Sequence, residues 1–118
     1  MESKQPTVLI DFKKNRVVIS RKTLQIIGNP RHILLLVNPE ERHFVVLQGD
    51  SADKRAHRIP YRKTERQREV EINSKSFMQT LISISDGWRE NVNYKIVGEY
   101  IQGENILRYR VADAVPTK

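Results

Sequence analysis

The chain has 118 residues, 38% of them hydrophobic and 30% charged, and it contains no cysteine. This length and composition predict one globular domain with a single core. The missing thiols exclude disulfide scaffolds, thiolate metal sites and cysteine nucleophiles. Residues 1–5 are polar and no run approaches eighteen apolar residues, so we expect a cytoplasmic protein with neither an export signal nor a membrane span.

The net charge of +7 is unevenly distributed along the chain. Residues 1–69 contain 15 Lys and Arg against 8 Asp and Glu, whereas residues 70–118 contain 6 of each kind. Such an asymmetry predicts a local positive field that attracts polyanions. The charge alone does not show whether the protein binds DNA, RNA or an acidic protein, or whether the charge serves only to keep the protein soluble.

The first strands are expected in short runs rich in β-branched residues. Val8–Phe12 and Arg16–Ile19 flank a polar turn, which predicts a bent strand or a tight hairpin. Farther on, two apolar runs over residues 32–48 flank a turn at Asn38–Glu41 and predict an antiparallel hairpin. The near-continuous apolar run Ile33–Val37 predicts a strand that is covered on both faces or lies at a subunit contact.

A helix of about two turns is expected between these hairpins. Ser20 fits the N-cap position, because its hydroxyl can accept a hydrogen bond from a free amide of the first turn. Gly28 and Pro30 supply the stop. Leu24 and Ile27 then face inward.

From Val70 the order of elements begins again. Val70–Ile72 predicts a strand, Asn73 an N-cap, and Ser74–Ser85 a helix that ends at Asp86 and Gly87. Its core stripe recurs at helical spacing and consists of Phe77, Leu81, Ile84 and Trp88. Residues 92–114 predict a second hairpin that turns through residues 102–105.

The two parts of the chain align at an offset of 53 residues, where Ile19 meets Ile72 and Ser20 meets Asn73. We therefore expect an α+β fold of two βαββ(β) pseudo-repeats, in which an antiparallel sheet carries two helices packed on one face. The halves are about 7–61 and 69–115 of a single domain 1–118, with a third strand at Ala56–Tyr61 in the first half. Independent use of one common arrangement is the alternative to a duplication.

This order of elements resembles one domain of a DNA sliding clamp, whose half-domains are βαβββ repeats. The segment "HFVVLQGDSADKRAHRIP", residues 43–60, is similar to the strand, charged turn and strand that follow a clamp hairpin. In that family the sheets form the outer wall and the helices face the DNA channel. The resemblance therefore implies that Arg21, Lys22 and Lys75 face DNA. It also implies a homo-oligomer, since one such domain cannot close a ring.

The stretch "RVVIS" and the helix after it are similar to the swapped-hairpin DNA-binding proteins of the AbrB and MraZ kind. In those proteins a glycine, an arginine, a β run and a proline lead into a short helix closed by glycine. Arg16 and Gly28 match this pattern. Asn15 stands where glycine is usual, Ser20 where proline is usual, and Leu24 where another arginine is frequent. The resemblance implies a transcription regulator as an alternative function.

A basic connector at about residues 50–69 joins the two halves and includes Tyr61, an aromatic residue available for stacking on a base. A solvated linker kept soluble by its charge is the alternative. With the helical cations, the connector would neutralise phosphates and release counterions, largely without regard to base sequence. The residues expected to contact nucleic acid are Arg16, Arg21, Lys22, Lys54, Arg55, Arg58, Arg62, Lys63, Arg66, Arg68 and Lys75.

Signals for catalysis are missing from the sequence. His32, His43 and His57 lack the paired spacing of a zinc site, and the five glycines form no phosphate-binding loop. We therefore expect a non-enzymatic, clamp-like DNA-associated protein without cofactor or metal, which self-associates through unpaired strand edges. An interaction module that binds an acidic protein is the alternative from a different functional class.

Overall fold

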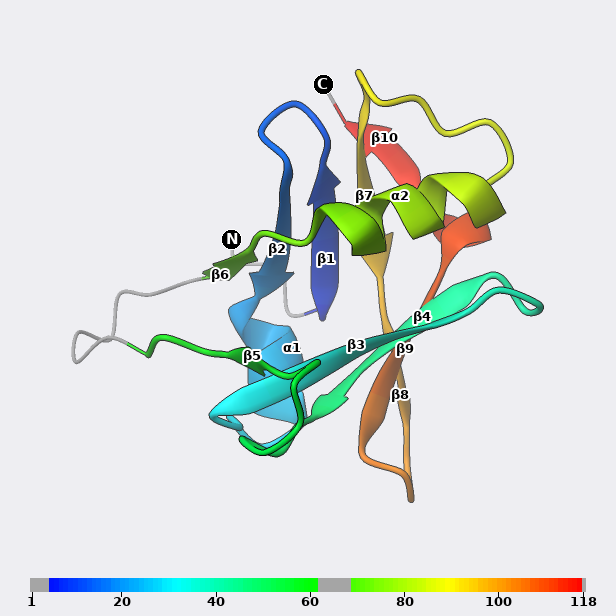
Figure 1. Ribbon diagram of the computed structural model, residues 1–118. Coiled ribbons are helices and arrows are strands. Elements are labelled where there is room, and N and C mark those ends of the chain that lie inside the picture. Colours follow the sequence, from blue (N-terminus) through cyan, green and yellow to red (C-terminus); the bar gives the residue numbers. More distant parts are fainter. Residues whose placement is uncertain (1–4, 62–68, 118) are drawn as a thin grey trace.

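The structure is a computed structural model that describes residues 5–61 and 69–117. Within these residues the fold is α+β, with two antiparallel five-stranded sheets and two α-helices (Figure 1). One continuous hydrophobic core contains side chains of both halves of the chain. No helix in the described part is long and apolar enough to cross a membrane.

Sheet A has the strand order β10-β7-β1-β2-β6 and sheet B the order β5-β3-β4-β9-β8. The strands of sheet A are β1 (Thr7–Asp11), β2 (Arg16–Ser20), β6 (Glu69–Ile72), β7 (Asn93–Val97) and β10 (Val115–Thr117). The strands of sheet B are β3 (His32–Asn38), β4 (His43–Gln48), β5 (His57–Arg58), β8 (Glu99–Ile101) and β9 (Ile106–Arg110). The helices are α1 (Arg21–Ile26), α2 (Lys75–Ile84) and the short 3-10 helix η1 (Val111–Asp113).

Sheet A is built around the β1–β2 hairpin. Asn15 turns the chain with a φ of 53°, in the left-handed region that asparagine tolerates better than most residues. Alternation along the strands then points Val8 and Ile10 of β1 into the core, together with Val17 and Ile19 of β2. All four are fully buried, so the period of two in the sequence determines which face of sheet A is internal.

The C-terminal hairpin connects the two sheets. β7 and β8 form one run that Gly98 interrupts, so that β7 lies in sheet A and β8 in sheet B. A Cβ atom at Gly98 would lie 2.6 Å from the ring of Tyr109, and the Gly98 amide donates to the Pro6 carbonyl at 2.7 Å. β9, η1 and β10 then return the chain from sheet B to sheet A.

Helix α1 begins as the sequence predicts. Ser20 Oγ accepts a hydrogen bond from the Thr23 amide at 3.2 Å, and Leu24 and Ile27 are buried. Two amide side chains hold its C-terminal end: the Ile27 carbonyl accepts a hydrogen bond from Gln48 of β4 at 2.6 Å and one from Asn105, in the turn between β8 and β9, at 3.3 Å. The helix therefore joins sheet A to sheet B.

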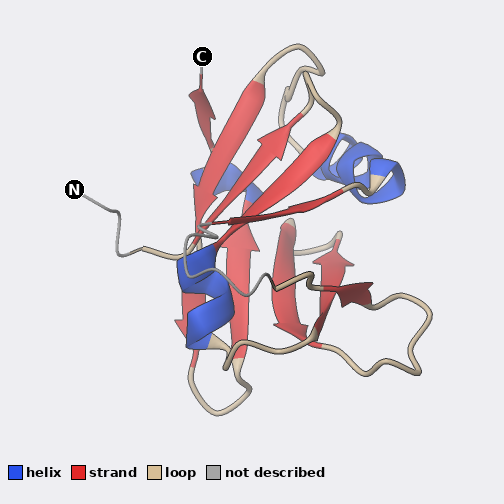
Figure 2. Ribbon diagram, turned by 90° about the vertical axis from the view of Figure 1, so that its left-hand side faces the viewer, coloured by secondary structure: helices blue, strands red, loops and turns tan. Residues whose placement is uncertain are grey.

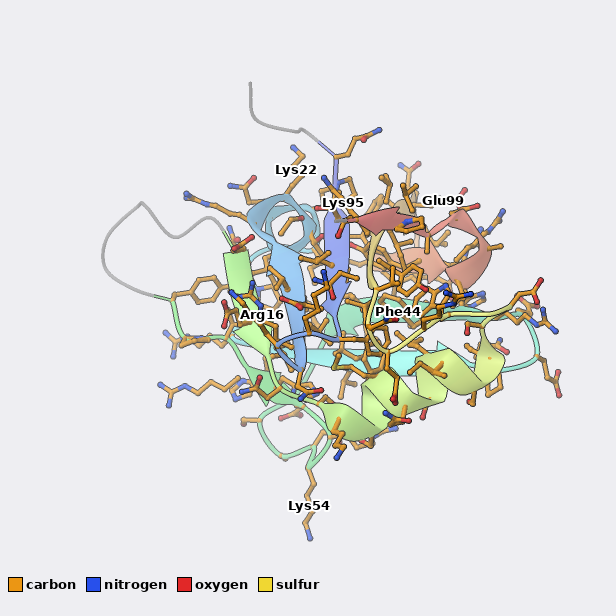
Figure 3. All side chains as sticks on the ribbon, turned by 90° about the horizontal axis from the view of Figure 1, so that it is seen from above. Arg16, Lys22, Phe44, Lys54, Lys95 and Glu99 are labelled. Carbon is orange, nitrogen blue, oxygen red and sulfur yellow. The ribbon has the colours of Figure 1, made fainter. Side chains whose placement is uncertain are left out.

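Helix α2 packs against β3 and places Phe77, Met78 and Leu81 in the core. The Phe77 ring meets the Phe44 ring edge to face, with centroids 5.1 Å apart. Figures 2 and 3 show that α1 and α2 lie on opposite sides of the molecule. The expectation that both helices pack on one face of one sheet is therefore wrong.

Several local predictions are confirmed, and others need correction. The β1–β2 and β3–β4 hairpins form, and the last hairpin turns at residues 102–105. The N-cap of α2 is Ser74 rather than Asn73, and the expected third strand shrinks to His57–Arg58. The strands form two sheets, because the inner apolar faces of the hairpins cover each other and Gly98 lets one strand run through both sheets.

Candidate nucleic-acid interface

An open pocket of about 550 Å³ lies beside β5 at the edge of sheet B. This volume is in the range of about 300 to 1,000 Å³ that is typical of small-ligand sites. We call it the basic pocket, and its lining residues are Arg31, His32, Arg58, Ile59, Pro60 and Tyr61.

The short strand β5 brings the two arginines of the basic pocket together. β5 pairs with the start of β3, so that His32 is opposite Arg58, and the Ile59 amide donates to the Arg31 carbonyl at 2.8 Å. Ile59 is buried and anchors the segment to the core. Arg31 and Arg58 thus approach from adjacent segments, although 26 positions separate them in the chain.

Both arginines have charges that are available to a ligand. Arg31 and Arg58 are exposed, and neither forms an ion pair with any residue in the described ranges. A guanidinium group donates to two oxygens at once, which suits phosphate and carboxylate. Burial lowers the pKa of the neighbouring His57, so this imidazole is neutral at neutral pH and adds no charge.

Tyr61 supplies an aromatic ring at the rim of the basic pocket. The residue is 44% exposed, and its hydroxyl donates to the Pro30 carbonyl at 2.7 Å. Burial raises the pKa of the Tyr61 phenol, so the hydroxyl stays a donor at neutral pH. The hydrogen bond fixes one end of the ring while part of its surface remains open, as stacking on a base requires.

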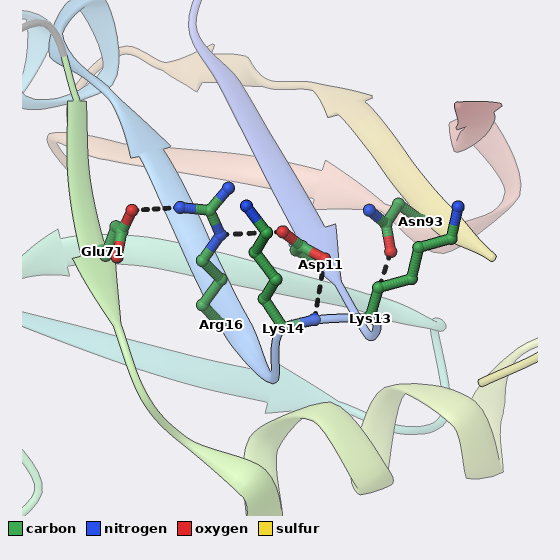
Figure 4. A network of polar contacts seen from close by, with 6 residues as sticks. All are labelled: Asp11, Lys13, Lys14, Arg16, Glu71 and Asn93. Carbon is green, nitrogen blue, oxygen red and sulfur yellow. Dashed lines mark hydrogen bonds and ion pairs between the residues drawn. The ribbon is translucent and has the colours of Figure 1, made fainter. Parts of the chain in front are cut away.

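Arg16 was expected to contact nucleic acid, but its charge is neutralised within the protein (Figure 4). Its Nε donates to Asp11 Oδ2 at 2.7 Å, and one terminal nitrogen donates to Glu71. Burial of Asp11 raises its pKa, but hydrogen bonds from Arg16 and the Lys14 amide outweigh this effect and hold the pKa below its ordinary value. The ion pairs join β1, β2 and β6, so Arg16 has a structural role.

The other expected cations do not share one surface. Arg21 and Lys22 belong to α1 and Lys75 to α2, and the two helices lie on opposite sides of the molecule. Lys54 points away from Lys22 in Figure 3. In the same loop as Lys54, Arg55 is paired with Asp53 at 2.9 Å. Arg62, Lys63, Arg66 and Arg68 lie outside the described residues.

Two residues of the basic pocket, Arg31 and His32, were missed by the reasoning from sequence. They follow the stop of α1 at once and precede the first apolar residue of β3. The only signal was this pair of basic or polar residues at the start of an apolar strand. Pairing of β3 with β5, which places them beside Arg58, is a tertiary contact.

The residues in the described ranges contain no cluster of three or more His, Cys, Asp or Glu side chains that could hold a metal ion. No family model matches the chain, and comparisons with curated proteins and with solved structures find no match either. The chemistry of the basic pocket is therefore the basis on which a function is proposed.

Proposed function

We propose that the protein is a non-enzymatic, DNA-associated binding protein whose basic pocket contacts the phosphate backbone. The observation that carries this proposal is the juxtaposition of two arginines, unpaired within the described ranges, with a half-exposed tyrosine at one sheet edge. The net charge of +7 supports it, because a positive surface attracts a polyanion from a distance.

In this mechanism Arg31 and Arg58 hold one phosphate or two adjacent ones, and an unpaired base stacks on Tyr61. Each phosphate that is neutralised releases counterions, so the affinity is high at low salt and falls as salt rises. Stacking tolerates any base, since every base has a π-face. The expected ligand is therefore single-stranded, and the expected sequence preference is weak.

Self-association and the two family resemblances remain proposals within this function. A clamp-like assembly would surround DNA with several copies, and an AbrB-like or MraZ-like regulator would intertwine hairpins between copies. The proposed duplication of a βαββ unit is compatible with either assembly. Because α1 and α2 lie on opposite sides, we base the contact on the basic pocket rather than on Arg21, Lys22 and Lys75.

Fluorescence anisotropy with a labelled oligo-dT strand, over a series of salt concentrations, tests the proposal. We expect the double change Arg31→Ala and Arg58→Ala to weaken binding about tenfold or more at low salt. The slope of log K against log salt should fall by roughly one per lost phosphate contact. Tyr61→Leu should weaken the binding of single-stranded DNA by about 1 to 3 kcal/mol and leave the binding of duplex DNA nearly unchanged.

Arg89→Ala is the matched control, because Arg89 is also an exposed arginine but follows α2, away from the basic pocket. It should change the affinity less than about twofold. Absence of binding at low salt contradicts the proposal, and so does an equal loss in the control. If polyglutamate competes as well as DNA does, an acidic protein becomes the better candidate ligand.

A further inference from the structure

The outer face of sheet B carries a cluster of aliphatic side chains that lie outside the hydrophobic core. Along β3, Ile33, Leu35 and Val37 point into the core, while Leu34 and Leu36 point outward. The same alternation on β4, β8 and β9 adds four more outward aliphatic residues. We call these six residues the aliphatic face: Leu34, Leu36, Val45, Leu47, Ile101 and Ile106.

The strand register makes part of this face a continuous row. Leu34 is opposite Leu47, Leu47 is opposite Ile106, and Ile106 is opposite Ile101. One aliphatic row therefore crosses β3, β4, β9 and β8 without a polar interruption. The neighbouring row continues it with Leu36 and Val45.

A sheet with one solvated face normally alternates apolar residues inward with polar residues outward. On the outer face of sheet A, charged residues interrupt the aliphatic ones across the strands, since Leu9 is opposite Lys95 and Val18 is opposite Glu71. None of the aliphatic face belongs to the core or packs against it, and five of the six side chains are partly exposed. Leu34, 8% exposed, is the buried one.

We infer that the aliphatic face is the contact between two copies of this chain. A twofold contact needs a surface that is complementary to itself. A row that is aliphatic from end to end meets this requirement, because its reversed copy again sets aliphatic side chains against aliphatic side chains. The apolar run in β3 predicted a strand that is covered on both faces or lies at a subunit contact. In the dimer, the second copy covers the outer face of this strand.

Charges at the border of the face also fit a second copy. Arg108 donates to Glu99 at 2.5 Å, and Arg110 lies 3.7 Å from the same carboxylate. Both signs of charge are therefore present beside the apolar row, so a rotated copy can set Glu99 of one chain near Arg110 of the other. A strongly acidic partner would lack a matching cationic surface over the aliphatic row itself.

The size of the face predicts a reversible dimer. Each of the six outward residues covers about 4.8 Å across the strands and about 6.6 Å along them, so the face covers roughly 190 Å² in projection. A standard stable interface buries about 800 Å² on each partner. We therefore expect association that depends on protein concentration rather than a permanent dimer.

Sedimentation velocity of the full chain over a concentration series tests this inference. The wild-type mass should rise from that of one chain toward that of two. Leu47→Lys, in the middle of the row, should raise the dissociation constant at least about tenfold, since it sets a charge against a charge. Val97→Lys is the control, because Val97 is 41% exposed on the outer side of sheet A and should leave dimerisation unchanged.

Leu47→Thr introduces a β-branched residue, which strands favour, and its result decides the test if Leu47→Lys does not fold. A wild-type chain that stays monomeric at the highest concentration overturns the inference. So does a dimer that survives both changes at Leu47, or one that Val97→Lys disrupts equally. Binding to oligo-dT is a separate readout, because the basic pocket lies at the β5 edge of sheet B and the aliphatic row does not include its residues.

Discussion

At the scale of single residues, the role of a cation depends on whether its charge is already neutralised. Arg16 and Arg58 look alike in the sequence, since each stands beside a β-branched or apolar run. In the structure Arg16 is paired with two carboxylates, whereas Arg58 has no ion pair among the described residues. The difference arises because Asp11 and Glu71 come from neighbouring strands, and only pairing of β1, β2 and β6 brings them together.

Asp11 provides a stability test at this scale. Its side chain is 4% exposed and accepts hydrogen bonds from Arg16 and from the Lys14 amide. We expect Asp11→Ala to lower the free energy of unfolding at neutral pH by about 2 kcal/mol, because these donors lose a charged acceptor. Urea unfolding measures the change, with Glu104→Ala, an exposed turn carboxylate, as the control.

The effect of Asp11 should depend on pH in a known direction. The folded state lowers the pKa of this carboxyl, so its contribution is present above the ordinary value of 3.8 and is lost as pH falls through the folded-state pKa. The wild type and Asp11→Ala should therefore converge in stability in acid. A gap that stays constant down to pH 2 would show that the charge of Asp11 is not the source of the effect.

At the scale of elements, Gly98 decides how one strand serves two sheets. The glycine allows the chain to pass against the ring of Tyr109, which is buried. Tyr109 in turn shares a hydrogen bond of 2.7 Å with Thr23 of α1 and stacks on Phe44 at 5.0 Å. The Tyr109 side chain thus links the chain at Gly98, helix α1 and sheet B.

Gly98→Ala should lower the free energy of unfolding by about 1 to 3 kcal/mol, because the added methyl group overpacks against the buried ring of Tyr109. A double-mutant cycle with Tyr109→Leu isolates this contact. We expect the alanine to cost less once the ring is removed. An equal cost in both backgrounds would place the strain in the backbone instead of in the contact with Tyr109.

At the scale of the whole molecule, the two halves of the chain are interleaved. The β1–β2 hairpin of the first half lies between β6 and β7 of the second, and β4 pairs with β9. Neither half can complete a sheet or the core by itself. This interleaving predicts one cooperative unfolding transition for the protein.

Fragments test the interleaving directly. Residues 1–61 and 62–118, produced separately, should each lack stable structure, since each leaves apolar strand faces uncovered. An equimolar mixture should regain the circular dichroism spectrum of the intact chain. A fragment that unfolds cooperatively alone would show that the halves are independent domains.

Much of the local structure could be predicted from the sequence, because its causes are local. Ser20 caps α1 through an amide three residues away, and the two apolar runs of β3 and β4 specify a hairpin about the short turn between them. The candidate site could be predicted only in part. Arg58 and Tyr61 stood out in the basic connector, but Arg31 joins them through strand pairing between distant segments.

The sequence by itself determined the hairpins, the two helices, the absence of thiol chemistry and the excess of positive charge, since these depend on composition or on neighbours along the chain. The tertiary structure alone decided that the strands form two sheets, that the helices lie on opposite sides, and which cations remain available. The physical reason is that strand pairing, and the close packing of residues such as Gly98, depend on contacts between segments that are far apart in the chain. The sequence pattern predicts which face of a strand is apolar, but only the tertiary packing determines which element covers that face.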